Sequence, residues 1–289
     1  HISFGIAPLI NAVGRLSQAA QAVDLLTHLE GELATGAAKN LANLNRKRQG
    51  IQRRIISEAL AQFEEEQLHD SPIVILKNKE WERGVVGVAA GKCIETNYKP
   101  TILLTEDGDV LVGSARSISG FSIFNALCAC QKFLVTFGGH DMAAGLSLQK
   151  EKFDAFVSAM TAYAGDDIDP ELFVATVKPD VIADLHEITH TLAVEIEKIG
   201  PFGIGNPNPI VQIMGAKISE VRAMGREGTH LSFRAGNKRI RCIWWGQGDL
   251  VARIANGSRI DFVGKIKVNE FRGHSSAEID ILDIALPSS

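Results

Sequence analysis

The order in which hydrophobic periodicity changes between residues 69 and 164 constrains the fold more than any other feature of the sequence. Apolar runs typical of strands at 73–76 and 101–105 flank a helical, glycine-punctuated segment at 84–96. Strand, helix, strand is the order of a βαβ crossover, so the two strands are expected to be parallel. We therefore predict a compact mixed α/β domain over 69–164. Its other elements are predicted as strands at 110–112 and 145–148 and helices at 122–132 and 153–163.

A helical pattern precedes this domain. Apolar residues recur every three or four positions in two groups, Val23, Leu26, Leu29 and Leu33, and then Ile51, Ile55, Ala59 and Phe63. Two helices, or one long bent helix, are expected over 19–63. Residues 39–54 carry six bases and no acid, a pattern that is typical of a solvated helix face.

After residue 164 the pattern changes again. Residues 165–205 form an acidic connector with a predicted helix, and 206–289 contain short alternating segments separated by glycine-rich turns. Five short strands of this kind predict a small barrel. The segments are 210–218, 229–235, 239–245, 260–268 and 277–284.

The net charge of −4 argues, taken alone, against a nucleic-acid-binding protein, because such proteins usually carry an excess of Lys and Arg. The charge is unevenly distributed, however. Residues 151–197 hold eleven acids and two bases, whereas 222–241 hold six bases and one acid. The whole-chain value is thus an average over an acidic connector and basic stretches. A composition of 45% hydrophobic and 22% charged residues excludes disordered and collagen-like classes.

The cysteines and the apolar runs indicate a reduced, cytoplasmic setting without a membrane anchor. None of the four cysteines stands in a C-x-x-C pair. No apolar run approaches the roughly 20 residues that a membrane-spanning helix needs. The chain opens on His1 rather than Met and continues directly into an apolar segment, so we expect a fragment of a longer protein.

Three short segments contain residues suited to an anionic ligand. The segment Gly113-Ser114-Ala115-Arg116-Ser117 follows a strand and offers small residues, a hydroxyl and a guanidinium, a set that suits a phosphate. Gly138-Gly139-His140 and Gly14-Arg15 offer a ring donor and a second guanidinium beside glycines. Each segment alone is equally compatible with a polar turn, a turn cap or a surface residue. Neither a nucleophile motif nor a cluster of metal ligands is readable.

In combination and in this order, the motifs closely resemble the bacterial RecJ family over essentially the whole chain. The motifs are Phe4-Gly5-Ile6-Ala7-Pro8, Asn11-Ala12-Val13-Gly14-Arg15-Leu16, Trp81 with Gly84-Val85-Val86-Gly87, Gly113-Ser114-Ala115-Arg116-Ser117-Ile118, Phe137-Gly138-Gly139-His140 with Ala143-Ala144-Gly145-Leu146, and Asn269-Glu270-Phe271-Arg272-Gly273. The resemblance implies the end of an Asp-His-His catalytic (DHH) domain and connecting helices over 1–68. It also implies a DHHA1 domain over 69–164, the connector over 165–205 and an OB-fold over 206–289.

The resemblance further implies a function. RecJ proteins are 5′-to-3′ single-stranded-DNA-specific exonucleases of DNA recombination and repair, with two Mn²⁺ or Mg²⁺ ions in the DHH domain. No Asp-His-His triplet occurs in this sequence, so the fragment alone is expected to be inactive and to hold no metal. The expected partner is single-stranded DNA with a free 5′ end, together with replication or repair proteins of unknown identity.

By resemblance, particular residues are assigned to DNA. The 5′ phosphate and the first backbone contacts are expected at Arg15, Ser114, Arg116, Gly138, Gly139 and His140. The path of the strand is expected along Asn45, Arg48 and Gln49. In the OB-fold the expected contacts are Arg222, His230, Arg239, Arg241, Trp244 and Arg272. Because neighbouring residues of a strand face opposite sides, one of Trp244 and Trp245 is expected to point into the core, and the sequence leaves open which.

Two other functions remain open. One is a DHH-family phosphodiesterase that acts on short RNA or cyclic dinucleotides, although such relatives generally end after the DHHA1 domain. The other is a non-catalytic single-strand-binding module built from the same folds.

Overall fold

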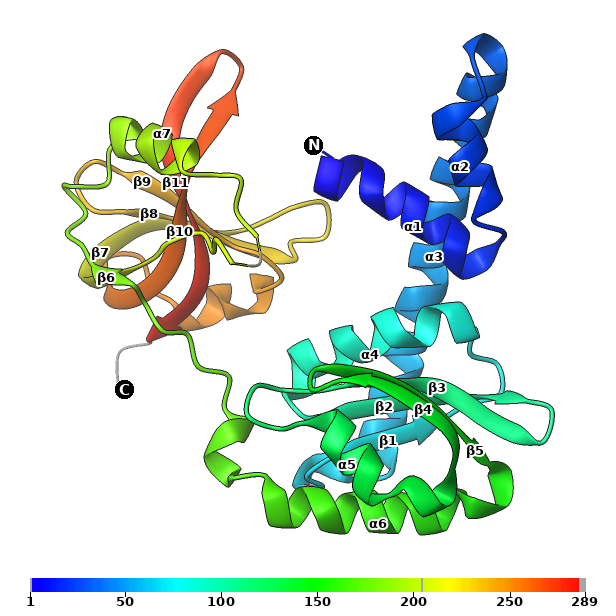
Figure 1. Ribbon diagram of the computed structural model, residues 1–289. Coiled ribbons are helices and arrows are strands. Elements are labelled where there is room, and N and C mark those ends of the chain that lie inside the picture. The colour runs from blue at the N-terminus through cyan, green and yellow to red at the C-terminus, as the bar shows by residue number, and fades with distance from the viewer. Residues whose placement is uncertain (1, 204, 286–289) are drawn as a thin grey trace. The chain divides into compact units, whose positions relative to one another are not determined.

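The computed structural model describes residues 2–203 and 205–285, so the last four residues of the expected barrel lie outside the described part. The chain divides into two compact units, His1–Ala175 and Thr176–Ser289 (Figure 1). Each unit has its own hydrophobic core. No helix in the described ranges combines the length and the apolar character that crossing a membrane requires.

The first unit begins with helices. A short π-helix, η1 (Ile2–Ile6), is followed by α1 (Ala7–Leu16), α2 (Ala20–Thr27) and the long α3 (Gly31–Glu65). Of the two predicted alternatives for 19–63, the structure has two helices. Leu41 in the first half of α3 packs against α1 and α2, whereas Phe63 near its end packs against α4 (Arg83–Asn97). Helix α3 therefore links the N-terminal helices to the domain that follows.

The rest of this unit is a five-stranded mixed sheet in the order β1-β2-β3-β5-β4. Strands β1 (Val74–Lys77) and β2 (Thr101–Asp107) are parallel and are joined by α4, which confirms the predicted βαβ unit. The other pairs are antiparallel. The remaining strands are β3 (Val110–Arg116), β4 (Leu134–His140) and β5 (Ala143–Gln149).

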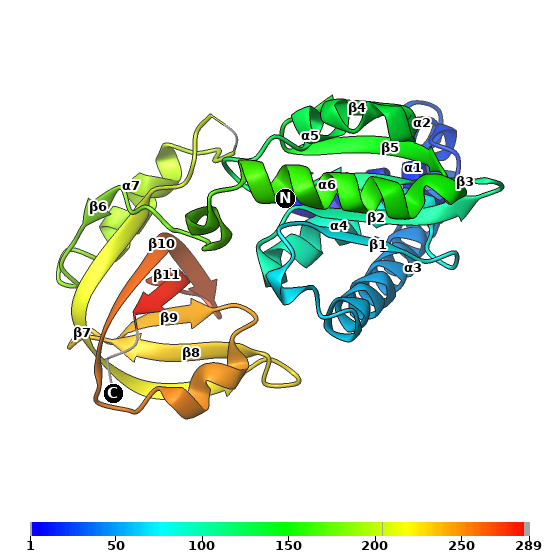
Figure 2. The same cartoon turned by 90° about the horizontal axis from the view of Figure 1, so that it is seen from below.

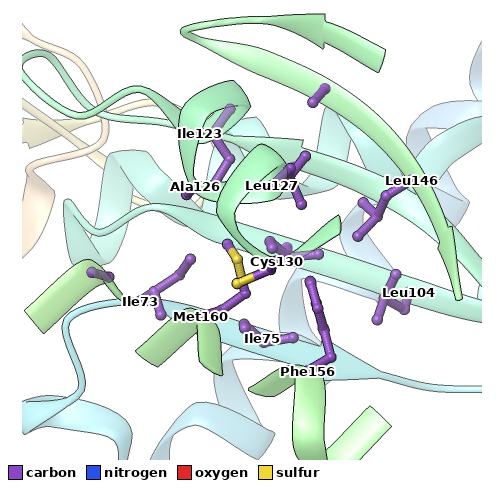
Figure 3. Close-up of a cluster of buried hydrophobic side chains, with 14 of the residues drawn as sticks. Ile73, Ile75, Leu104, Ile123, Ala126, Leu127, Cys130, Leu146, Phe156 and Met160 are labelled. Carbon is purple, nitrogen blue, oxygen red and sulfur yellow. The ribbon is translucent and has the colours of Figure 1, made fainter. Parts of the chain in front are cut away.

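Helices cover both faces of this sheet. Figure 1 shows α4 on one face and α6 (Phe153–Asp167) on the other, and Figure 2 shows α6 running across the sheet. Helix α5 (Ile123–Ala129) contributes to the same core as α6. Figure 3 shows this core, in which Phe156 and Met160 of α6 lie near Ile75 of β1. Short 3₁₀ turns complete the unit at η2 (Leu68–Asp70), η3 (Gln131–Phe133), η4 (Lys150–Lys152) and η5 (Pro170–Phe173).

Two turns expected from the sequence are wrong. Residues 113–116 lie inside β3 and 138–140 lie inside β4, rather than in loops. Glycine weakens a strand signal because it lacks a side chain to pack, so glycine-rich strands look like turns in a sequence. Their membership in the sheet gives these residues a fixed register, which a loop would not.

The second unit is a closed five-stranded barrel, as predicted. The sheet order is β10-β11-β9-β8-β7-β6, and pairing of β10 with β7 closes the first five strands into the barrel. The short strand β6 is added beside β7, with which it pairs in parallel. Helix α7 (His190–Lys198) packs on the barrel, and its Ala193 joins the barrel core with Ile188. The other elements are β6 (Val181–Ile182), β7 (Ile210–Met224), β8 (His230–Ala235), β9 (Ile240–Trp244), η6 (Gly248–Arg253), β10 (Arg259–Phe271) and β11 (His274–Ala285).

Candidate nucleic-acid interface

The register of β3, β5 and β4 brings predicted phosphate residues into two adjacent rows. Arg116 and His140 both pair with Ala143, while Ser114 and Gly138 both pair with Gly145. Directly paired residues of antiparallel strands lie on the same face of a sheet. Ser114 also pairs with Leu103, which packs in the same core cluster as α4. The two rows therefore lie on the face that α4 covers in part.

The part of this face that α4 does not cover is exposed, and two glycines form its surface. Gly138 and Gly145, here called the glycine shelf, are both exposed. A Cβ atom placed on Gly138 would meet no atom within 4 Å, and one on Gly145 would meet only the Gly113 carbonyl oxygen at 3.9 Å. A ligand can therefore approach the backbone of both strands directly.

Helix α4 approaches Arg15, Ser114 and Arg116 through two further glycines, which are not among the predicted site residues. A Cβ atom on Gly87 would lie 3.0 Å from Arg116 Nη2 and 3.0 Å from Ser114 Oγ. A Cβ atom on Gly84 would lie 2.0 Å from the Arg15 carbonyl oxygen. Their spacing of three residues puts both on one face of the helix. That spacing is visible in the sequence, but what the glycine face packs against is not.

Three arginines from separate elements form the arginine cluster, namely Arg15 of α1, Arg48 of α3 and Arg116 of β3. Burial, and then the positive charge of Arg15, lowers the pKa of both Arg48 and Arg116. An arginine remains charged at neutral pH despite such a shift. The cluster therefore concentrates positive charge that an anion would stabilise.

The hydrogen bonds of the cluster run to neutral groups. Arg15 donates to the Gly84 carbonyl at 3.3 Å and Arg116 donates to the Ala115 carbonyl at 2.8 Å. Arg48 donates to Asn45 Oδ1 at 3.1 Å and to Gln52 Oε1 at 2.7 Å. Among the described residues, none of the three forms an ion pair with a carboxylate. Guanidinium groups held this way are typical of phosphate recognition.

The other predicted residues of the first unit differ in accessibility. Asn45 is buried and its amide oxygen holds Arg48, whereas Gln49 is exposed on α3. Gly139 has φ +155° and lies in close contact with Ala144, so no other residue fits there. His140 is exposed, and its Nδ1 accepts from the Met142 N–H at 3.3 Å. In the neutral ring the proton is then on Nε2, which is available as a donor.

In the second unit the predicted arginines and His230 lie on or beside the outer face of the barrel, whereas Trp244 packs against its core. Arg234 pairs with Arg241, Arg241 pairs with Glu278, and Glu278 pairs with Lys267. Arg239 forms an ion pair with Glu220, and Arg241 Nη1 lies 3.0 Å from Glu278 Oε2. These two guanidinium groups are therefore partly neutralised. A groove on this face is lined by Arg222, Arg234, Arg241, Phe271, Arg272 and His274.

The carboxylate of Glu278 is buried among these cations. Glu278 Oε1 lies 3.1 Å from Lys267 Nζ, while its Oε2 lies within ion-pair distance of Arg241 without hydrogen-bond geometry. Burial lowers the pKa of Lys267, but hydrogen bonds and charges from Asp280 and Glu278 outweigh burial and raise it. Lys267 is therefore firmly charged at neutral pH.

The two adjacent tryptophans have opposite orientations. Trp244 pairs with Leu231 and packs against the barrel core, whereas Trp245 is 50% exposed. His230 lies edge-on to Trp245, with ring centroids 4.9 Å apart. The exposed indole of this pair is thus Trp245.

Comparison with known proteins matches both units. The DHHA1 domain model matches residues 70–166, and the RecJ OB domain model matches 179–283. The single-stranded-DNA-specific exonuclease RecJ of Bacillus subtilis is 34% identical over 99% of this chain, and that of Thermus thermophilus is 31% identical over all of it. The chain thus contains a DHHA1 domain and a RecJ OB domain, and it is similar to RecJ proteins over its whole length. It spans 37% and 40% of the length of these two RecJ proteins.

Solved RecJ structures agree with the fold. The crystal structure of Thermus thermophilus RecJ in complex with Mg²⁺ has a TM-score of 0.83 and 29% identity, and covers all of this chain and 44% of its own. The complex with Mn²⁺ has a TM-score of 0.80. The expected family and the expected fold class, an α/β DHHA1 domain followed by an OB barrel, are both confirmed.

Both of these RecJ structures are complexes with a divalent metal ion, so we asked whether residues of this chain could hold one. Within 2–203 and 205–285, no three His, Cys, Asp or Glu side chains lie close enough together to hold a metal ion. The described residues therefore do not fit such a centre.

Proposed function

We propose that this chain is the substrate-binding part of a 5′-to-3′ single-stranded-DNA-specific exonuclease that acts in DNA recombination and repair. The first unit takes the 5′-terminal phosphate, and the second unit binds the strand that trails behind it. Hydrolysis of the phosphodiester bond, and the Mn²⁺ or Mg²⁺ ions that support it, belong to residues outside this sequence.

The observation that carries the proposal is the arginine cluster beside Ser114 and the glycine shelf. A terminal phosphate has more negative charge than a bridging phosphodiester, so three guanidinium groups without carboxylate partners favour a strand end over its interior. Ser114 and His140 Nε2 add neutral donors at the two sides of the shelf. Fixing the 5′ end in this way sets the position of the next phosphodiester bond, a contribution to catalysis through positioning.

The OB barrel supports this function over the two alternatives. A DHH-family phosphodiesterase acting on short RNA or cyclic dinucleotides has no need of a second, strand-binding unit. A non-catalytic single-strand-binding module needs the barrel but has no use for a pocket specific to a terminal phosphate. The presence of both features favours an enzyme that works from a strand end.

Binding of matched oligonucleotides tests the proposal. Fluorescence anisotropy of the 289-residue chain at low salt is expected to show tighter binding of a 5′-phosphorylated oligothymidylate than of the 5′-hydroxyl form. Arg116→Ala removes a charge-assisted contact and is expected to reduce this preference about 10-fold.

Arg53→Ala is the matched control, because Arg53 is an exposed arginine of α3 outside the cluster. It lowers affinity for both oligonucleotides alike through the loss of general charge attraction. Equal binding of the two forms by the unmodified chain contradicts a terminal-phosphate site. Unchanged preference in Arg116→Ala contradicts the role of Arg116.

A further inference from the structure

The outer face of the OB barrel carries a strip of outward-facing positions along β9 and the β10–β11 hairpin, although Ile243 and Glu278 in its middle are each only 2% exposed. On β9 the outward positions are Arg241 and Ile243, since Cys242 and Trp244 face the core. On β11 they include Glu278 and Asp280, which pair with Arg241 and Ile243. Trp245 follows directly at one end of this face. At the other end, the hairpin tip presents Phe271, which pairs with His274.

Trp245 is held in a fixed orientation while half of its surface stays exposed. Its indole Nε1 donates to Asp280 Oδ1 at 3.0 Å. Lys267 Nζ lies 5.6 Å from the centre of its ring and also bonds Asp280 at 2.7 Å. These two contacts restrict the rotation of the Trp245 side chain but leave half of its surface accessible to a ligand. Such a ring can accept a stacking partner at low entropic cost.

Phe271 at the far end is 63% exposed, and the Arg272 guanidinium lies 5.2 Å from the centre of its ring. Ile243 is level with Asp280, so Trp245 and His274 are about eight strand positions apart. At roughly 3.3 Å per residue, the strip is about 26 Å long. Arg222, Arg234 and Arg241 line the groove that includes Phe271, and the strand register places Arg241 between Phe271 and Trp245.

We propose that Trp245 and Phe271 are stacking platforms for two unpaired bases of a single strand, with the groove arginines contacting the phosphates between them. This inference rests on the proposed function and assigns the stacking role to Trp245 instead of Trp244, whose ring packs against the core. OB-folds bind about 4–16 nucleotides of a single strand, with successive bases stacked on aromatic side chains. Stacking uses the flat face of a base, which all four DNA bases have, so this binding is expected to be independent of sequence.

Stacking is tested by removing either the ring or the bases. We compare binding of an oligothymidylate of about 15 nucleotides with binding of an abasic strand of equal length, using the 289-residue chain and anisotropy. Trp245→Ala is expected to weaken binding of the oligothymidylate about 10-fold and to leave the abasic strand unchanged. Trp245→Phe keeps a flat ring and is expected to retain most of the affinity.

The outcomes separate this inference from the proposed function. If the unmodified chain does not bind the oligothymidylate at low salt, the proposed function fails. If it binds and Trp245→Ala binds equally well, only the stacking role is overturned. Equal loss on both strands also overturns it, because damage to the barrel weakens phosphate contacts too. Phe271→Ala, at the exposed hairpin tip, is expected to behave as Trp245→Ala does.

Discussion

At the scale of single residues, the phosphate site depends on missing side chains as much as on those present. Gly84 and Gly87 let α4 approach the Arg15 backbone on one side and the side chains of Ser114 and Arg116 on the other. The cost is a weaker helix, since a glycine in a helix interior destabilises it relative to alanine. We infer that both glycines are present in α4 because any side chain there would prevent its close contact with Arg15, Ser114 and Arg116.

The role of Gly87 is open to a direct test. Gly87→Ala gains helix propensity but places a methyl group 3.0 Å from Arg116 Nη2 and Ser114 Oγ. Thermal unfolding is expected to change little, whereas the preference for a 5′-phosphorylated strand is expected to fall several-fold because both groups must move. A variant that kept the full preference would show that Arg116 and Ser114 need not stay where they are.

Gly91→Ala, in the same helix, is the control. A Cβ atom there meets nothing within 4 Å. This variant is expected to stabilise the protein by about 0.5–1 kcal/mol and to leave oligonucleotide binding as it is.

At the scale of helices and strands, hydrophobic periodicity predicted the elements with a regular apolar pattern but not the strand whose pattern glycine interrupts. The βαβ unit and the barrel strands follow from runs of apolar residues. Strand β4 is not predicted by the sequence pattern, because Gly138-Gly139 breaks its alternation. The register that aligns His140 with Arg116 follows only from strand pairing. Alternation predicted that Trp244 and Trp245 face opposite sides, but only the barrel packing identifies the inward one.

The close pairing of β3 with β2 gives a prediction for the sheet. A Cβ atom on Gly113 would lie 2.0 Å from the Leu103 carbonyl oxygen, a backbone atom that cannot yield without moving β2. Gly113→Ala is expected to destabilise the first unit by about 3 kcal/mol, measured by urea unfolding.

Gly138→Ala offers a comparison in the same sheet, because the space above Gly138 is open. It is expected to unfold like the unmodified protein while binding a 5′-phosphorylated strand less well. Similar stability of the two variants would contradict the difference in packing that the structure assigns to these glycines.

At the scale of the whole molecule, the proposed function divides into two binding tasks, one for each of two separately packed units. Residues 1–175 hold 16 bases and 21 acids, whereas 176–289 hold 14 bases and 13 acids. The net charges are therefore −5 and +1, so the proposed attraction to DNA depends on where the arginines lie rather than on net charge. The motif order in the sequence predicted both domains, and the resemblance predicted Arg15 and Arg116 at one phosphate. That Arg48 lies close enough to Arg15 to join them follows only from the structure.

Separating the two units tests this division. Residues 176–289 alone are expected to fold, because their core is complete within the unit, and to bind 5′-phosphorylated and 5′-hydroxyl strands equally. Residues 1–175 alone are expected to bind weakly and to prefer the phosphorylated end. Thermal unfolding followed by anisotropy on each unit provides the measurement. A preference for the 5′ phosphate in the isolated barrel would contradict the assignment.

The glycine shelf has a consequence for what the proposed enzyme can distinguish. A protein tells one base from another with side-chain donors and acceptors placed against the base edges. Gly138, Gly145 and Ala143 between them offer only peptide backbone and one methyl group to a nucleotide lying on the shelf. Such a surface suits an exonuclease that must remove whichever nucleotide comes next. Because no side chain of the shelf contacts the base edges, all four bases can be bound alike.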